Sequence, residues 1–300
     1  MKFRSIGSLS VSEVGIGCNN FGGRIDEAAT HEVVNAALEV GINFFDTADI
    51  YGKTLSEEFL GRAIKGRRDQ VIIATKFGYQ LDKEGPDASP DYIRKACDDS
   101  LRRLGIDCID LYQQHLPDPK VPIEDTLGTL NELVLSGKVK EIGCSNFDVP
   151  MLKDAEAKAK GAKFVSVQNH YSLFHREPEE GVLEECARQG LGFLPYFPLA
   201  YGLLSGKYRK GQPLPQSFRI TEGHAQLTEQ NLDRVELLTA FCESRGHTIL
   251  ELAFAWLLSK QLVSSVIAGA TSAAQVKANS AAPGWVLTQG ELDEIDQIVQ

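Results

Sequence analysis

The sequence has no apolar run that approaches the roughly 20 residues needed to cross a bilayer. Its first residues, Met1 to Ser5, lack the apolar core of a secretory signal. Its six cysteines form no C-x-x-C pair and no Cys/His grouping with metal-ligand spacing. These absences argue against a membrane protein, a secreted disulfide scaffold and a metal site. We therefore predict a soluble cytoplasmic protein with reduced thiols and no resident metal.

Excess positive charge is also missing. The formal net charge is −10, which argues against nucleic acid as a partner because phosphate backbones require clustered Lys and Arg. One segment departs from this balance, since the stretch from Phe197 to Thr221 contains no Asp or Glu. An acidic protein that binds a phosphorylated ligand must concentrate positive charge locally, and this segment does so. Its basic residues are Lys207, Arg209, Lys210 and Arg219.

Short apolar segments alternate with amphipathic helical patterns along almost the whole chain. The predicted strands cover residues 14–17, 43–46, 71–76, 108–115, 140–144, 164–168, 191–196 and 264–268. The predicted helices include residues 28–40, 90–104, 123–136, 150–160, 179–189, 229–245 and 249–260. Eight strand–helix alternations in 300 residues are what an α/β barrel of the (β/α)8 or TIM type produces.

Other segments add to this repeat. Phe3–Ser5 and Val11–Glu13 predict an N-terminal β-hairpin, and Leu287–Gln300 predicts a C-terminal amphipathic helix that could pack across the bottom of the barrel. Residues 197–225 form a long Gly- and Pro-containing loop, which is typical of a functional lid or a disordered segment. Because no linker or break in composition divides the chain, we predict one domain over residues 1–300, a (β/α)8 barrel with extra C-terminal helices.

Seven of the eight predicted strands end in a polar or titratable residue or a glycine. Each residue alone could have a structural role, such as a helix cap or a solvated strand end. The C-terminal ends of barrel strands converge on one mouth, however, so we expect these side chains to lie together there. They are Asp46, Lys76, His115, Ser145 with Asn146, Gln168 with Asn169, Tyr196 and Gly269.

Tyr51, five residues after Asp46, would complete a proton-handling group at this mouth. A tyrosine with an ordinary pKa near 10 is a poor acid at neutral pH, and a nearby ammonium lowers that pKa. A carboxylate keeps the ammonium charged, and an imidazole can hydrogen-bond the oxygen being protonated. Such a group gives a proton to a carbonyl oxygen or removes one from an alcohol. The simpler alternative is that Asp46 caps a helix beginning near Leu55 and Tyr51 packs on it.

Several segments resemble the aldo-keto reductases, in order and at family spacing over nearly the whole chain. They are Asp46–Gly52, Ala74–Lys76, Tyr112–Asp118, Gly137–Phe147, Gln168–Tyr171, Tyr196–Tyr208 and Ile267–Gln275. The resemblance implies an oxidoreductase that transfers a hydride between a nicotinamide cofactor and an aldehyde, ketone or sugar. The pattern is also similar to the aldo-keto-reductase-like β subunits of potassium channels. A cofactor-binding regulatory subunit with little turnover is therefore the alternative.

The resemblance also implies roles for individual residues. Tyr51 would be the general acid–base, Lys76 and Asp46 would tune it, and His115 would orient the substrate carbonyl. Ser145, Asn146 and Gln168 would hold the carboxamide of the nicotinamide, and Tyr196 would stack on its ring. Cys18 and Asn19 would line the nicotinamide pocket, and the positions from Phe197 onward would follow the pyrophosphate to the adenosine end. The implied cofactor-binding residues are Cys18, Asn19, Asp46, Ser145, Asn146, Gln168, Tyr196, Phe197, Pro198, Leu199, Ala200, Lys207, Arg219, Gly269, Thr271, Gln275 and Asn279.

Cofactor choice and substrate are less well defined. Gly269 and Gln275 stand where one branch of the family has Lys and Arg on the 2′-phosphate, yet both also occur in a branch that uses NADPH. Ala278 stands where many members have a Glu that contacts adenine. NADP(H) is therefore expected and NAD(H) is plausible. The substrate, the physiological direction and the oligomeric state stay open, with Phe21, Tyr79, Gln80, Phe174 and Phe218 as candidates for substrate specificity.

Overall fold

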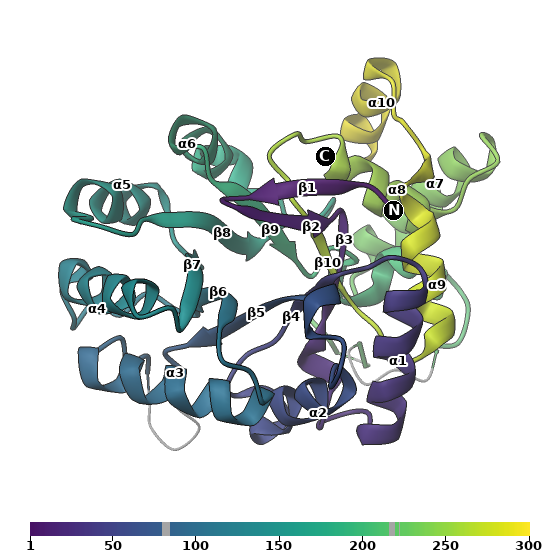
Figure 1. Cartoon of the computed structure of the whole chain (residues 1–300). Coiled ribbons are helices and arrows are strands. Elements are labelled where there is room, and N and C mark those ends of the chain that lie inside the picture. Colours follow the sequence, from purple (N-terminus) through teal and green to yellow (C-terminus); the bar gives the residue numbers. More distant parts are fainter. Residues whose placement is uncertain (80–84, 216–219, 222) are drawn as a thin grey trace.

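The centre of the molecule is a sheet of eight parallel strands (Figure 1). The computed structural model describes residues 1–79, 85–215, 220–221 and 223–300. Neighbouring strands follow the order β10-β3-β4-β5-β6-β7-β8-β9. Each predicted strand is present, with bounds that differ by no more than two residues. The strands are β3 (Val14–Gly17), β4 (Phe44–Asp46), β5 (Ile72–Phe77), β6 (Ile109–Gln114), β7 (Val139–Ser145), β8 (Phe164–His170), β9 (Gly192–Tyr196) and β10 (Val266–Gly269).

The two ends of this strand order meet through a short bridge. The backbone N–H of Phe193 in β9 donates to the carbonyl of Leu262 at 2.8 Å, and the Phe193 carbonyl accepts from the N–H of Ser264 at 2.9 Å. Since Ser264 leads directly into β10, this bridge brings β9 and β10 together. The sheet is a nearly closed barrel, and the predicted (β/α)8 class is confirmed.

Helices flank the barrel, and local signals set several of their ends. The Asp26 side chain accepts from the N–H of Ala29 at the start of α1, Pro90 occupies the first turn of α3, and Gly105 ends α3 in a left-handed conformation. The helices are α1 (Glu27–Glu39), α2 (Leu55–Ala63), α3 (Pro90–Leu104), α4 (Ile123–Leu135), α5 (Val149–Lys158), α6 (Val182–Gln189), α7 (Glu229–Glu243), α8 (Ile249–Leu258), α9 (Ala273–Ala281) and α10 (Gln289–Val299).

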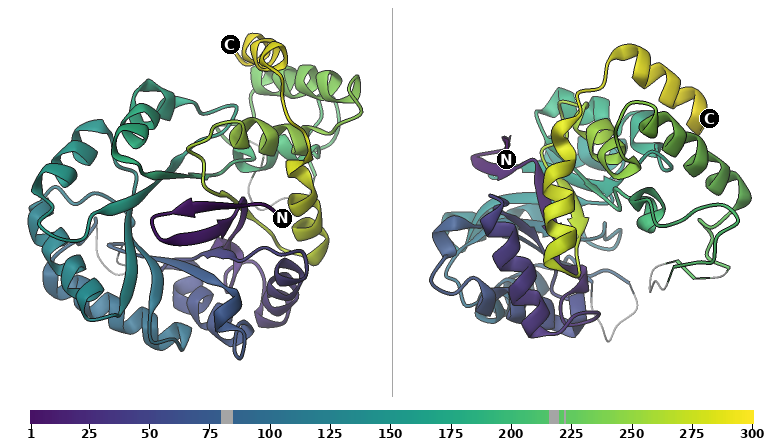
Figure 2. Two further views of the ribbon diagram at one scale, coloured as in Figure 1. Left: turned by 45° about the horizontal axis from the view of Figure 1, so that its top comes forward. Right: turned by 90° about the vertical axis from the view of Figure 1, so that its right-hand side faces the viewer.

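The N-terminal hairpin covers one end of the barrel. Strands β1 (Phe3–Ile6) and β2 (Leu9–Ser12) pair in antiparallel fashion, as predicted. Ile6, Leu9 and Val11 form a buried cluster with Phe44, Leu111 and other apolar side chains of the barrel strands. Figure 2 shows the hairpin lying across the opening of the ring. Only the opposite end, where the strands terminate, is left to form a site.

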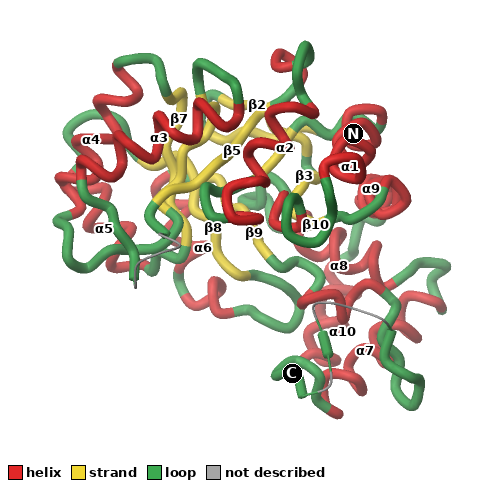
Figure 3. The backbone as a smooth tube through the Cα atoms, turned by 90° about the horizontal axis from the view of Figure 1, so that it is seen from below, coloured by secondary structure: helices red, strands yellow, loops and turns green. Residues whose placement is uncertain are grey.

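The prediction that the C-terminal helix packs across the barrel bottom is wrong. Helix α10 instead lies beside α7 at the edge of the molecule (Figures 1 and 3). Arg245, just after α7, pairs with Glu294 of α10 at 2.7 Å, and Ile295 and Val299 are buried. The hairpin already covers the bottom, so the apolar stripe of α10 is buried elsewhere.

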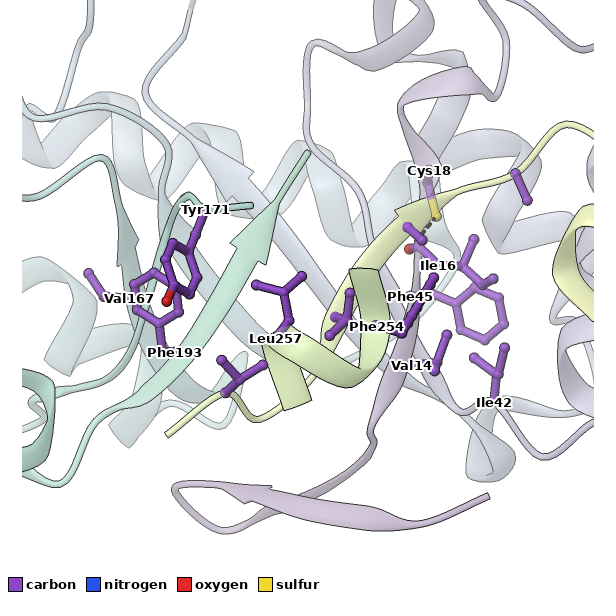
Figure 4. Packing of buried hydrophobic residues seen from close by; sticks show 14 of the residues in the cluster. Val14, Ile16, Cys18, Ile42, Phe45, Val167, Tyr171, Phe193, Phe254 and Leu257 are labelled. Atoms are coloured by element: carbon purple, nitrogen blue, oxygen red, sulfur yellow. Dashed lines mark hydrogen bonds between the residues drawn. The ribbon is translucent and has the colours of Figure 1, made fainter. Parts of the chain in front are cut away.

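Helix α8 explains why two helices precede β10. Seven of the nine residues from Ile249 to Leu257 are buried, and a helix that is apolar over most of its surface must be covered on both sides. Figure 4 shows Phe254 and Leu257 among core residues that include Ile16 of β3 and Phe193 of β9. Since α7 packs against α8, α7 is the additional helix that covers it.

A buried polar cluster lies behind the loop that follows β4. Glu57 of α2 accepts hydrogen bonds from Thr75 Oγ1 and from Arg103 Nε, both at 2.6 Å. Asp49 is 7% exposed and accepts from the hydroxyl of Tyr92 at 3.2 Å. Its Oδ1 atom has no hydrogen-bond partner among the residues that the structure describes. Burial, with the nearby Glu57 carboxylate, raises the pKa of Asp49 to about 7.

This raised pKa predicts that Asp49 makes stability depend on pH. Between the ordinary carboxyl pKa of 3.8 and about 7, the folded state holds a proton that the unfolded chain has released. The contribution of Asp49 is therefore present at low pH and is lost as pH rises through about 7. From about pH 5.5 to about pH 7.5 we expect the stability of the wild type, relative to Asp49→Asn, to fall by about 2 kcal/mol.

Urea unfolding of both proteins at the two pH values measures this change. Asp91→Asn is the control, because Asp91 is a fully exposed carboxylate on α3. We expect the difference in unfolding free energy between wild type and Asp91→Asn to be the same at both pH values. If the difference between wild type and Asp49→Asn is also the same at both, Asp49 does not hold a proton in the folded state.

Candidate functional site

The mouth of the barrel contains a cavity of about 250 Å³. Side chains from the ends of several strands line it, which confirms that these strand ends converge. Gly17 and Gly269, which are paired in the β3–β10 register, leave part of its wall without side chains. The other lining residues are Asn19, Asp46, Tyr51, His115, Ser145, Asn146, Gln168, Tyr196, Phe197, Pro198 and Ile267.

A buried ion pair lies at the inner side of this cavity. Lys76, at 0% exposure, donates from Nζ to Asp46 Oδ2 at 2.6 Å and to the Thr47 carbonyl at 2.9 Å. The other oxygen of Asp46 accepts from Nε2 of Gln168 at 2.9 Å and of Gln113 at 3.1 Å. Burial alone would lower the pKa of Lys76, but the Asp46 carboxylate and Tyr51 together outweigh it, so the pKa is raised and the ammonium stays charged at neutral pH.

The alternative role for Asp46 as a helix cap is wrong. Helix α2 begins after Thr54, and no side chain caps it. Both carboxylate oxygens of Asp46 are instead used by Lys76 and the two glutamine amides.

Tyr51 lies beside this pair, on the short 3-10 turn η2 (Tyr51–Thr54). The Lys76 ammonium is 5.1 Å from the centroid of the Tyr51 ring. Burial raises the pKa of Tyr51, and it outweighs the ammonium, which lowers that pKa as predicted from the sequence. The phenol therefore carries its proton at neutral pH and can donate it.

His115 faces Tyr51 across the cavity. The two rings meet edge to face, with centroids 5.9 Å apart. Burial and the Lys76 charge lower the pKa of His115 to about 3, so the imidazole is neutral. Its Nδ1 atom is buried and has no partner within the described part of the chain. A neutral imidazole beside a phenol is suited to hydrogen-bonding a substrate oxygen.

A polar wall from β7, β8 and β9 completes the cavity. Asn146 donates from Nδ2 to the His115 carbonyl at 3.0 Å and accepts from the Tyr196 hydroxyl at 2.8 Å. Ser145 Oγ donates to the Gln168 carbonyl at 2.7 Å. The ring of His170 stacks on Tyr196, with centroids 5.4 Å apart. These contacts hold amide and hydroxyl groups at the cavity surface.

A second cavity of about 400 Å³ shares Phe197, Pro198 and Gly269 with the first. The two therefore form one continuous groove along the mouth. Two cations, Arg24 and Lys207, line the second cavity, and none of its described lining residues is Asp or Glu. Its other lining residues are Asn20, Leu199, Tyr201, Gly202, Ser205, Tyr208, Pro215, Leu250, Ala268, Thr271, Gln275, Ala278 and Asn279.

Most of the predicted cofactor-binding residues line one of these two cavities, but two do not. Cys18 is fully buried, and its Sγ faces the Ile16 carbonyl at 3.6 Å (Figure 4). Ala200 is 2% exposed and packs in the core. Phe21, a candidate for substrate specificity, is also fully buried. Arg219, Gln80 and Phe218 lie outside the described residues.

Two of the basic residues in the acid-free segment are paired with α7. Arg209 pairs with Glu236 at 2.7 Å, and Lys210 pairs with Glu229 and Asp233. Lys207 has no carboxylate within ion-pair distance in the part of the chain that the structure describes. Lys207 is therefore the described residue of this segment whose charge is available to a ligand.

Sequence reasoning missed several residues of the site. Gln113 bonds Asp46 from inside the barrel, and Asn20 and Arg24 line the second cavity. Gln113 lies in a buried strand, two residues before His115, so the alternation of side chains along β6 could have placed it inside the barrel. No local sequence pattern identifies Arg24, because its place at the cavity depends on the path of the loop between β3 and α1.

Backbone strain gathers around this site. The non-glycine residues with positive φ in the described chain all lie on loops at the mouth: Lys53, Thr54, Asn146, Phe197, Ala200 and Tyr201. Such conformations cost free energy and are found preferentially at functional sites.

No group of three or more His, Cys, Asp or Glu residues within the described ranges could hold a metal ion. Likewise, none of the described helices is long and apolar enough to span a membrane.

Comparisons with known proteins agree with this geometry. The model of the Aldo/keto reductase family matches residues 13–300. A probable aldo-keto reductase from Glycine max is 34% identical over 305 residues, covering 97% of this chain and 86% of that protein.

Two solved structures are similar over nearly the whole chain. The glycerol dehydrogenase of Gluconobacter oxydans has a TM-score of 0.89 at 29% identity, covering 99% of this chain and 95% of that one. An aldo-keto reductase from Bacillus halodurans, in its holo form, has a TM-score of 0.84 at 35% identity, covering 100% of this chain and 97% of that one. The protein therefore belongs to the aldo/keto reductase family of oxidoreductases.

Proposed function

We propose that the protein is an NADP(H)-dependent oxidoreductase that interconverts a carbonyl compound and an alcohol, with Tyr51 as the general acid–base. One observation carries the proposal. Tyr51, Asp46 and His115 line one cavity, and Lys76 is bonded to Asp46 behind it. That cavity continues into the second one, which is lined by two cations and no described carboxylate. A proton-transfer group thus adjoins a binding site for an elongated, negatively charged molecule.

The residues present fit a nicotinamide dinucleotide. Ser145, Asn146 and Gln168 offer amide and hydroxyl groups for a carboxamide, and Tyr196 offers an aromatic ring at the same cavity. The two glycine positions 17 and 269 leave room beside them. Lys207, with Thr271, Gln275 and Asn279 across the groove, would hold the phosphates and the adenosine end. When bound, the cofactor supplies or accepts the hydride that side chains cannot provide.

The side chains would then manage the proton. In reduction, Tyr51 donates its phenolic proton to the carbonyl oxygen as charge develops there, while the neutral His115 hydrogen-bonds the same oxygen. The Lys76 ammonium, held by Asp46, stabilises the phenolate that results. In oxidation the same phenolate accepts the proton of the alcohol.

The substrate is proposed only by class. The similarity to a glycerol dehydrogenase makes small polyols the first alcohols to test, and small aldehydes and ketones are the corresponding carbonyl compounds. Tyr79, which is 43% exposed and whose ring centroid is 6.1 Å from that of His115, lies near the cavity and would contact such substrates.

Fluorescence titration with NADPH and, separately, NADH tests the cofactor assignment without knowledge of the substrate. We expect saturable binding, tighter for NADPH. Binding of neither dinucleotide would overturn the proposed function. Tight binding with no turnover of any aldehyde, ketone or polyol would favour the regulatory-subunit alternative.

The change Tyr51→Phe is expected to lower kcat by at least about 100-fold, because it removes the proton donor, while the Kd for NADPH stays within about twofold of the wild type. Absorbance at 340 nm measures turnover, and the titration above measures Kd. Tyr171→Phe is the control, since the Tyr171 hydroxyl bonds Glu179 and lines neither cavity. Wild-type turnover by Tyr51→Phe would remove Tyr51 from the mechanism.

The change Lys207→Ala is expected to weaken NADPH binding roughly tenfold or more, because a charge-assisted contact to phosphate is lost. Lys210→Ala should leave the Kd close to the wild-type value, because the Lys210 ammonium is already paired with Asp233 and Glu229 of α7. Equal effects of the two substitutions would show that only the overall charge of the segment matters.

A further inference from the structure

Arg24 is a cation of the groove that has no assigned role. It lies on the loop between β3 and α1 and lines the second cavity together with Asn20. Lys207 belongs to the segment after β9, and Thr271 and Gln275 follow β10. In the strand order, β10 lies between β3 and β9, so Arg24 and Lys207 come from loops on the two sides of the β10–α9 loop.

The loop that carries Arg24 has a fixed path. The backbone N–H groups of Arg24 and Ile25 both donate to the Asn20 carbonyl, at 2.8 and 3.1 Å, and Gly22 N–H donates to the Ile25 carbonyl at 3.0 Å. Phe21 is fully buried beneath the loop. Gly22 has a φ of +71°, and a Cβ there would lie 2.4 Å from Leu55 Cβ. The backbone position of Arg24 is therefore set before any ligand binds.

The Arg24 guanidinium has no carboxylate within ion-pair distance among the residues that the structure describes. Its contact to Asn20 Oδ1 is long, at 3.5 Å. Partial burial lowers the pKa of Arg24, although the guanidinium remains charged at neutral pH. A partly desolvated cation on a fixed loop, in a cavity with no carboxylate among its described lining residues, is suited to an anion.

The loop also indicates which anion this is. Asn19 lines the first cavity and Asn20 the second, so the loop passes the junction of the two. Asn20 donates from Nδ2 to the Ala270 carbonyl at 3.2 Å, which ties the loop to the residue after Gly269, itself shared by both cavities. A dinucleotide that fills both cavities places its pyrophosphate at this junction, between its two nucleosides.

We propose that Arg24 binds the pyrophosphate of the dinucleotide, as a partner to Lys207 from the other side of the β10–α9 loop. This assignment rests on the proposed function. Because NADPH and NADH share the pyrophosphate and differ in the 2′-phosphate, Arg24 would contribute equally to both and would not select between them.

Titrations of wild type, Arg24→Ala and Arg24→Lys with NADPH and NADH test the assignment. We expect Arg24→Ala to raise both Kd values by a similar factor, roughly 10- to 100-fold, and Arg24→Lys to raise them less. Arg102→Ala is the control, because Arg102 is an exposed arginine that pairs with Asp99 on α3. A loss confined to NADPH would move Arg24 to the 2′-phosphate and overturn the proposal, and so would unchanged affinities.

Calorimetry with inorganic pyrophosphate separates this proposal from the proposed function. We expect the wild type to bind pyrophosphate and Arg24→Ala to bind it at least about tenfold more weakly. If the wild type binds neither dinucleotide but binds pyrophosphate in an Arg24-dependent way, the dinucleotide function fails and the anion site stands. If pyrophosphate binding is the same in both proteins, or absent from both, Arg24 is not a pyrophosphate ligand.

Discussion

The ion pair between Lys76 and Asp46 is the interaction on which the mouth of the barrel depends. Removing an ammonium from water costs several kcal/mol, and an unpaired partner left behind would be strongly destabilising. Here Lys76 is fully buried, and the cost is offset by one carboxylate and one carbonyl. Asp46 in turn accepts from Gln113 and Gln168. The ends of β4, β5, β6 and β8 are thus joined through one set of charges and amides.

Apolar burial elsewhere in the fold offsets the free-energy cost of this buried ion pair. The hairpin buries Ile6 and Val11 against the interior of the barrel at its other end, and α7 covers the largely apolar α8. Among the described residues, the non-glycine positive φ angles all lie at the mouth, where Lys53 and Thr54 follow Tyr51 and Gly52. A Cβ on Gly52 would lie 2.4 Å from the Phe21 carbonyl, so the Tyr51 loop and the Arg24 loop pack directly on each other. The Tyr51 loop and the groove therefore share one support.

The sequence allowed the barrel and the strand-end residues to be predicted, because both follow from patterns with a fixed physical origin. Apolar runs of strand length alternate with helical periods, and parallel strands bring Asp46, Lys76 and His115 to the same edge. Features set by three-dimensional competition were not predictable. Helix α10 lies on α7 because the hairpin already occupies the bottom. Burial reverses the net shift in the pKa of Tyr51 that the Lys76 charge alone would give.

The charge pattern of the groove shows the same limit. Counting residues gave four cations and no acid between Phe197 and Thr221, which suggested a uniformly positive segment. In the fold, carboxylates one helical turn apart on α7 neutralise Arg209 and Lys210, while Lys207 is left without such a partner among the described residues. The second cation of the groove, Arg24, comes from a loop almost two hundred residues earlier. In a protein of net charge −10, the site available to an anion is therefore set by the cations that the fold leaves unpaired. The number of cations in a sequence segment matters less.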